Sequence, residues 1–115
     1  MSQITYYTKK QCEVEKWVQS LGIRTKLEED IEQYRVDVGI FELDLAIEID
    51  GPSHRKLPKE GKLITLDQER ISKRDKLLLQ YYPNGIYHVP VDISEEDFKS
   101  EFQKIINKVS NGFSS

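Results

Sequence analysis

The chain has 115 residues, which is enough for one domain with an ordinary hydrophobic core. Its 17 Lys and Arg residues stand against 20 Asp and Glu residues, and the formal net charge of −3 excludes a basic surface over the whole molecule. The single cysteine excludes an internal disulfide, and the apolar runs are too short to cross a bilayer, so we expect an intracellular, cytoplasmic protein without membrane partners.

Hydrophobic periodicity and turn residues divide the chain into helices and strands. The predicted elements are a helix over residues 8–21, a short strand over 23–27, an acidic turn over 28–30, strands over 34–40 and 43–50 joined by a turn at 41–43, a loop over 54–66, a helix over 67–81, a strand over 86–91, and a last helix after Ser94. The order α-β-β-β-α-β-α predicts an α/β fold with a mixed sheet flanked by helices. We expect a single domain over residues 1–115, with residues 111–115 as a frayed tail.

The predicted hairpin over residues 34–50 fixes which side chains share a face. A turn centred on Glu42–Leu43 places Val38 opposite Ile47. In this register all the alternating apolar residues lie on one face of the hairpin: Val36, Val38, Ile40, Leu45, Ile47 and Ile49. A shift by one residue would move this apolar set to the opposite environment, so the pattern favours the register strongly.

The other face of the hairpin carries three carboxylates. Asp37 lies opposite Glu48, and Asp50 follows two residues later on the same face. Directly opposed like charges destabilise a sheet, so a compensating cation is expected. Mg²⁺ suits this role because it binds one or two carboxylates together with water and phosphate oxygens. The alternative is a solvated face on which Lys or Arg neighbours pair with the acids.

His54 and a segregation of charge add to this pattern. His54 follows the acidic strand after a Gly-Pro-Ser turn, where it could transfer protons or bind a metal. Nine acidic residues stand against Arg35 alone over residues 28–50, whereas eight basic residues stand against four acidic ones over residues 51–80. An acidic metal centre beside a basic segment suits a phosphodiester substrate, although a solvated helix face would give the same charge run.

Four stretches of the chain together resemble the PD-(D/E)xK nuclease superfamily. They are YRVD at 34–37, LAIEIDGPSH at 45–54, RD followed by LL at 74–78, and GIYHVP at 85–90. Within the superfamily the chain is most similar to very-short-patch-repair endonucleases and related EDxHD nucleases, and RAP domains share the AIEIDGPSH stretch. The resemblance implies a restriction-endonuclease-like α-β-β-β-α-β core and metal-dependent cleavage of nucleic acid, with DNA as the expected substrate.

The resemblance also assigns roles to residues. It implies Asp37, Glu48 and Asp50 as metal ligands and catalytic acids, with Mg²⁺ as the cofactor and Mn²⁺ as a substitute. It implies that His54 activates water or assists the leaving group, and that Asp75, or else Asp67, orients this histidine. Arg70 and Arg74 match the basic helix of the family. Together with Arg55 and Lys56 of the basic segment, they are the residues expected to bind nucleic acid.

Two departures from the family pattern bear on activity. The usual motif lysine is absent because position 50 is Asp, so water activation would pass to His54, Lys56 or Arg74. The family pattern also has a glutamate on the first helix. Glu15 is the candidate for this position, and the alternative is Gln11, which supplies no charge. The chain is therefore predicted to be a metal-dependent endonuclease, acting as a homodimer or with a partner that supplies specificity. The alternative is a RAP-like module that binds nucleic acid without efficient cleavage.

The remaining polar and aromatic residues are interpreted as structural. His88 alternates within a strand and is expected to be structural, and Cys12 has no catalytic partner in its neighbourhood. The adjacent Tyr81 and Tyr82 could stack on bases, but a position at the edge of the core is the preferred interpretation.

Overall fold

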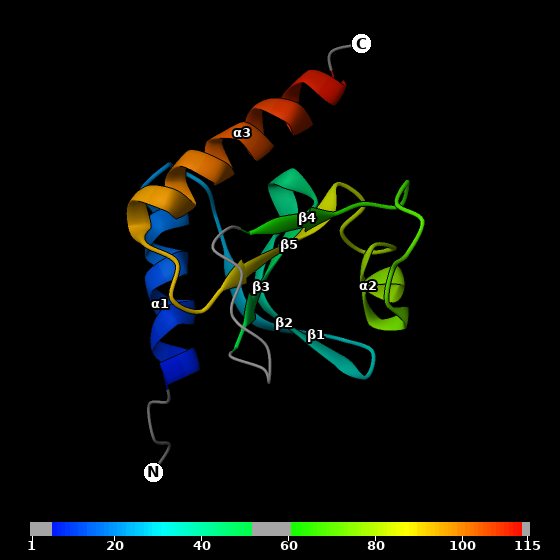
Figure 1. Ribbon diagram of the computed structural model, residues 1–115, viewed down its shortest axis with the longest axis horizontal. Helices are drawn as coiled ribbons and strands as arrows, with labels where there is room; N and C mark the ends of the chain where they lie inside the picture. The colour runs from blue at the N-terminus through cyan, green and yellow to red at the C-terminus, as the bar shows by residue number, and fades with distance from the viewer. Residues whose placement is uncertain (1–5, 52–60, 114–115) are drawn as a thin grey trace.

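The computed structural model describes residues 6–51 and 61–113, and a five-stranded mixed sheet forms its centre, with strand order β1-β2-β3-β5-β4. The elements are α1 (Tyr6–Gln19), β1 (Lys26–Ile31), β2 (Tyr34–Ile40), the 3₁₀ turn η1 (Phe41–Leu43), β3 (Leu45–Asp50), β4 (Lys62–Ile64), α2 (Lys73–Leu78), β5 (Gly85–Pro90) and α3 (Glu95–Phe113). Helices α1 and α3 lie on one side of the sheet and α2 on the other (Figure 1). The predicted α/β fold with a mixed sheet, flanking helices and a C-terminal helix is confirmed.

The central hairpin has the predicted register. Strands β2 and β3 pair antiparallel, and Val38 lies opposite Ile47. Strand β5 then pairs parallel with β3 on its other side, so that Glu48 of β3 has His88 of β5 as its partner. The crossover from β3 to β5 includes α2, which brings this helix over the face of the sheet that carries Ala46.

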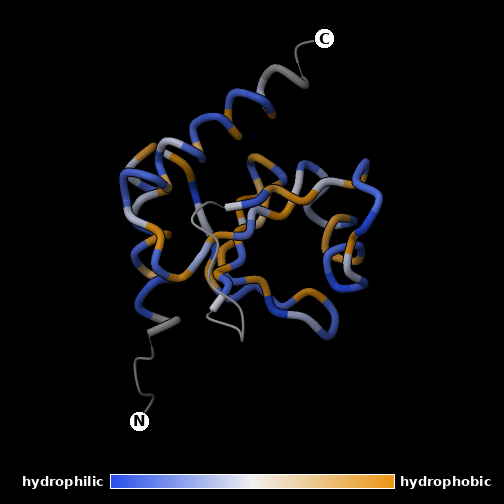
Figure 2. Tube along the Cα trace, in the orientation of Figure 1, coloured by the Kyte–Doolittle hydropathy of each residue, from blue (hydrophilic) through white to orange (hydrophobic). Residues whose placement is uncertain are grey.

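Two hydrophobic clusters hold the helices to the two faces of the sheet. The larger cluster joins α1 and α3 to the sheet, and its aromatic centre includes Phe98 and Phe102, whose ring centroids lie 5.2 Å apart. The smaller cluster joins α2 and the segment after it to the sheet through Leu78, Leu79 and Tyr82. Hydrophobic and hydrophilic residues alternate along α3 (Figure 2), as expected for a helix with one buried face.

The hairpin β1–β2 differs from the sequence prediction in two ways. The acidic turn expected at 28–30 belongs to strand β1, where Asp30 lies opposite Arg35 and forms an ion pair with it at 2.9 Å. Val36 packs in the cluster on the α2 side, rather than with the other five apolar residues of the hairpin. Glu28 has φ 49°, and this left-handed residue interrupts the pairing of β1 with β2 and marks a bend in the outer part of the hairpin.

The segment after β3 also differs from the prediction. Residues 62–64 of the expected loop form β4, which pairs antiparallel with the edge of β5. Helix α2 begins at Lys73 rather than at residue 67, because Ser72 caps it by accepting a hydrogen bond from the Asp75 backbone N–H at 3.0 Å. It ends at Leu78, and turns lead on to β5. Helix α3 continues to Phe113, past the position where the frayed tail was expected to begin.

Candidate functional site

Asp37 lies where the ladder between β2 and β3 ends. The last paired residues are Val38 and Ile47, and beyond them the Asp37 side chain takes the place of a backbone partner. Its Oδ2 accepts a hydrogen bond from the Ile49 backbone N–H at 2.7 Å, and its Oδ1 accepts one from Gln11 Nε2 at 2.6 Å. Because Ile49 directly follows Glu48, these two bonds fix the Asp37 carboxylate beside Glu48.

Glu48 is a buried carboxyl group in this position. Only 5% of the residue is exposed, and its Oε1 accepts a hydrogen bond from Arg74. Burial and the neighbouring Asp37 carboxylate raise the pKa of Glu48 to about 8, even though the Arg74 guanidinium acts in the opposite direction. Asp37 and Glu48 therefore form a pair of carboxyl groups that repel each other when both are ionised, as predicted for opposed acids on one hairpin face.

Arg74 is the cation that faces this pair. Its guanidinium binds Glu48, donates to the Arg35 backbone carbonyl at 3.0 Å, and lies 5.7 Å from the centroid of the Tyr34 ring. Arg74 was predicted to contact nucleic acid from the surface of its helix. The structure turns its side chain inward, so that it compensates part of the charge of the carboxylate pair.

Asp50 lies in a second network, around His88. The Nδ1 atom of His88 is 3.1 Å from Asp50 Oδ1, and its Nε2 atom is 2.9 Å from Asp75 Oδ2. Burial lowers the pKa of His88, but the two carboxylates raise it more, to about 10, so the imidazole is a cation at neutral pH. Burial acts to raise the pKa of Asp75, but the hydrogen bond and charge of His88, together with Arg74 and Ser72, outweigh burial and hold that pKa below its usual range.

The two networks bear on how a metal ion would be held. No group of three or more His, Cys, Asp or Glu side chains that could hold a metal occurs within residues 6–51 and 61–113. Asp37 and Glu48 supply two carboxylates, which is the number that Mg²⁺ commonly takes from a protein, with water and phosphate oxygens completing its shell. The carboxylates of Asp37 and Glu48 therefore fit a hydrated Mg²⁺ or Mn²⁺ if the Arg74 guanidinium moves away from Glu48. Asp50, which was predicted as a third ligand, contacts His88 instead.

The other predicted site residues are distributed as follows. Of the two candidates on α1, Gln11 reaches Asp37, whereas the Glu15 carboxylate accepts a hydrogen bond from Thr25 Oγ1 at 2.9 Å. Arg70 is exposed in the segment before α2, and Asp67 contacts Thr65 there. Three predicted residues lie outside the described residues: His54, Arg55 and Lys56.

His88 is the site residue that sequence reasoning missed. It was interpreted as structural because a histidine that alternates within a strand is usually part of the core. His88 lies beside the carboxylates of β3 only because β5 pairs parallel with β3, and no local sequence pattern predicts that pairing. Asp75 was expected to orient His54, which lies outside the described residues, and within the described chain Asp75 contacts His88 instead.

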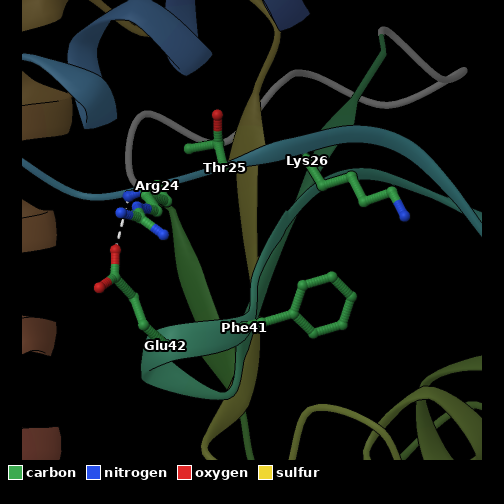
Figure 3. A pocket seen from close by; sticks show the side chains of 5 residues that line it. All are labelled: Arg24, Thr25, Lys26, Phe41 and Glu42. Carbon is green, nitrogen blue, oxygen red and sulfur yellow. Dashed lines mark hydrogen bonds between the residues drawn. The ribbon is translucent and has the colours of Figure 1, made fainter.

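A separate cleft of about 380 Å³ lies at the opposite end of the hairpin, around η1. Figure 3 shows the exposed Phe41 ring below Lys26, and Glu42 accepting a hydrogen bond from the Arg24 backbone N–H at 2.5 Å. This cleft shares no lining residue with the two networks described above. It is therefore distinct from the carboxylate site.

The comparisons with known proteins leave the family open. No family model, no curated protein and no solved structure matches the chain significantly. A search of the described helices found none with the length and apolar character needed to span a bilayer.

Proposed function

We propose that the protein is a metal-dependent nuclease that hydrolyses phosphodiester bonds at the Asp37–Glu48 pair. The single observation that supports this most is the buried Glu48 carboxyl beside Asp37, held there by the Ile49 amide and Gln11. Because the pKa of Glu48 is raised to about 8, this pair keeps a proton at neutral pH when no cation is bound, and a divalent cation that also binds phosphate would replace that proton as the compensating charge.

Each residue of the site has a definite task in this proposal. Asp37 and Glu48 hold the cation, and when bound it supplies Lewis-acid activation of water and of the phosphate. The Gln11 amide fixes the orientation of Asp37 without adding charge. When nucleic acid binds, the Arg74 guanidinium would release Glu48 and bind a phosphate oxygen, because guanidinium binds carboxylate and phosphate with the same geometry. The resemblance assigns proton transfer to His54.

One observation favours the second candidate function, a nucleic-acid-binding module without efficient cleavage. The Arg74 guanidinium forms an ion pair with the Glu48 carboxylate, and both oxygens of Asp37 accept hydrogen bonds from the protein. If these bonds persist when nucleic acid binds, the carboxylates are structural. In either case the proposed partner is a nucleic acid, with DNA as the first choice, and the proposed location is cytoplasmic. A homodimer or a second protein would supply sequence specificity.

A cleavage assay separates the two functions. We expect the purified protein to nick supercoiled plasmid DNA in Mg²⁺ or Mn²⁺, and the Asp37→Asn variant to lose this activity. Asp30→Asn is the matched control, because Asp30 is an exposed aspartate on the neighbouring strand. Equal nicking by wild type and Asp37→Asn would contradict the proposed site. DNA binding without nicking in either metal would support the binding module instead.

A further inference from the structure

A small cleft lies between the β1–β2 turn and the segment of helix α2 and the residues after it. Its volume is about 190 Å³. The residues that line it are Gln33, Tyr34, Lys73, Lys76, Leu77 and Gln80. This set combines two lysines with two amides and a phenol, and it contains no carboxylate. The cleft is therefore electropositive, within a chain whose net charge is negative.

The two lysines are available to a ligand. Both are exposed, and they lie three residues apart on α2, which places them on one side of the helix. Neither forms an ion pair with an acidic side chain in the described parts of the chain. Arg74, between them in sequence, is directed to Glu48 instead.

Tyr34 connects this cleft to the carboxylate pair. Its ring lines the cleft and also lies 5.7 Å from the Arg74 guanidinium that binds Glu48. Tyr34 is therefore a residue that the cleft and the surroundings of Arg74 have in common. The cleft is smaller than the roughly 300–1,000 Å³ of sites for drug-sized ligands, so it suits one phosphate group rather than a whole nucleotide.

We propose that this cleft binds the phosphodiester backbone of the nucleic acid that the carboxylate pair cuts. The inference deepens the proposed function and depends on it for the identity of the substrate. Lys73 and Lys76 supply the charge for a phosphate flanking the reacting one, and the amides of Gln33 and Gln80 supply donors to its oxygens. Such contacts position the duplex without reading its sequence.

The test is the salt dependence of DNA binding in EDTA, measured by fluorescence anisotropy with a labelled duplex. Because the cleft holds one phosphate, replacing both lysines with Lys73→Gln and Lys76→Gln lowers the magnitude of the slope of log K against log salt by about 0.9. The matched control is the double variant Lys104→Gln and Lys108→Gln on α3, where both lysines are exposed. We expect the control to keep the wild-type slope.

Three outcomes would overturn the inference: an unchanged slope in the α2 variant, an equal loss in the control, or polyglutamate competing as well as DNA of equal charge. Each single variant lowers the magnitude of the slope by less than the double variant does, and serves if the double variant does not fold. Because EDTA removes the metal, this result is independent of cleavage. A changed slope together with undiminished nicking by Asp37→Asn would refute the proposed function and leave the phosphate cleft standing.

Discussion

Replacing Glu48 by glutamine converts the raised pKa of this residue into a measurable change in stability. The folded protein holds the Glu48 proton up to about pH 8, whereas the unfolded chain releases it near 4.5. The folded state therefore binds more protons in this range, and wild-type stability falls as pH rises through it. Each pH unit costs about 1.4 kcal/mol, so the loss between pH 5 and pH 8 is about 3–4 kcal/mol.

The glutamine side chain of the variant cannot ionise, so the variant escapes this loss. We expect the free energy of unfolding of Glu48→Gln, relative to wild type, to increase by about 3–4 kcal/mol from pH 5 to pH 8. Urea unfolding followed by circular dichroism and by Trp17 fluorescence measures it, because Trp17 packs on Phe98 in the core. His88 titrates in both proteins, so its contribution cancels to first order. A difference that stays constant with pH would show that Glu48 is an ordinary ionised carboxylate, and would refute the reasoning.

Three further changes test other parts of the structure. The raised pKa of His88 gives the wild type stability that is complete below pH 6.5 and is lost toward pH 10. From pH 7 to pH 10 the free energy of unfolding of His88→Gln should therefore fall by about 2–4 kcal/mol less than that of wild type. Urea unfolding curves with the same pH dependence in both proteins would contradict this. Gly39→Ala should lower stability by about 1–3 kcal/mol in thermal unfolding, because its Cβ would lie 2.7 Å from Tyr82 Oη, and adding Tyr82→Phe should restore it; no recovery would place the clash elsewhere. Ser72→Ala should cost about 1 kcal/mol through loss of the α2 cap, and an unchanged melting temperature would argue against that cap.

The central hairpin could be predicted from sequence because its signals are local. Alternation of apolar residues and a short turn fix which residues oppose each other, and the predicted pairing of Val38 with Ile47 is confirmed. The juxtaposition of Asp37 and Glu48 follows from the same register. The start of α2 was predicted too early, although Ser72 and Asp75 have the spacing of a capping motif that marks the observed start.

The parts that could not be predicted depend on long-range packing. The contact between Asp50 and His88 follows from the parallel pairing of β3 with β5, which are separated by the whole crossover. The choice of Gln11 over Glu15 depends on how α1 rotates against the sheet, and the two residues lie one helical turn apart. The inward direction of Arg74 depends on the burial of Glu48, which no pattern in α2 reveals.

Diffraction from a crystal soaked in Mn²⁺ tests the central claim most directly. We expect an anomalous density peak between the carboxylates of Asp37 and Glu48, with the Arg74 guanidinium displaced from Glu48. An Asp37→Asn crystal treated in the same way should lack this peak. Wild-type crystals with no peak at this pair, and with Arg74 still bound to Glu48, would contradict the claim that these carboxylates hold a metal ion.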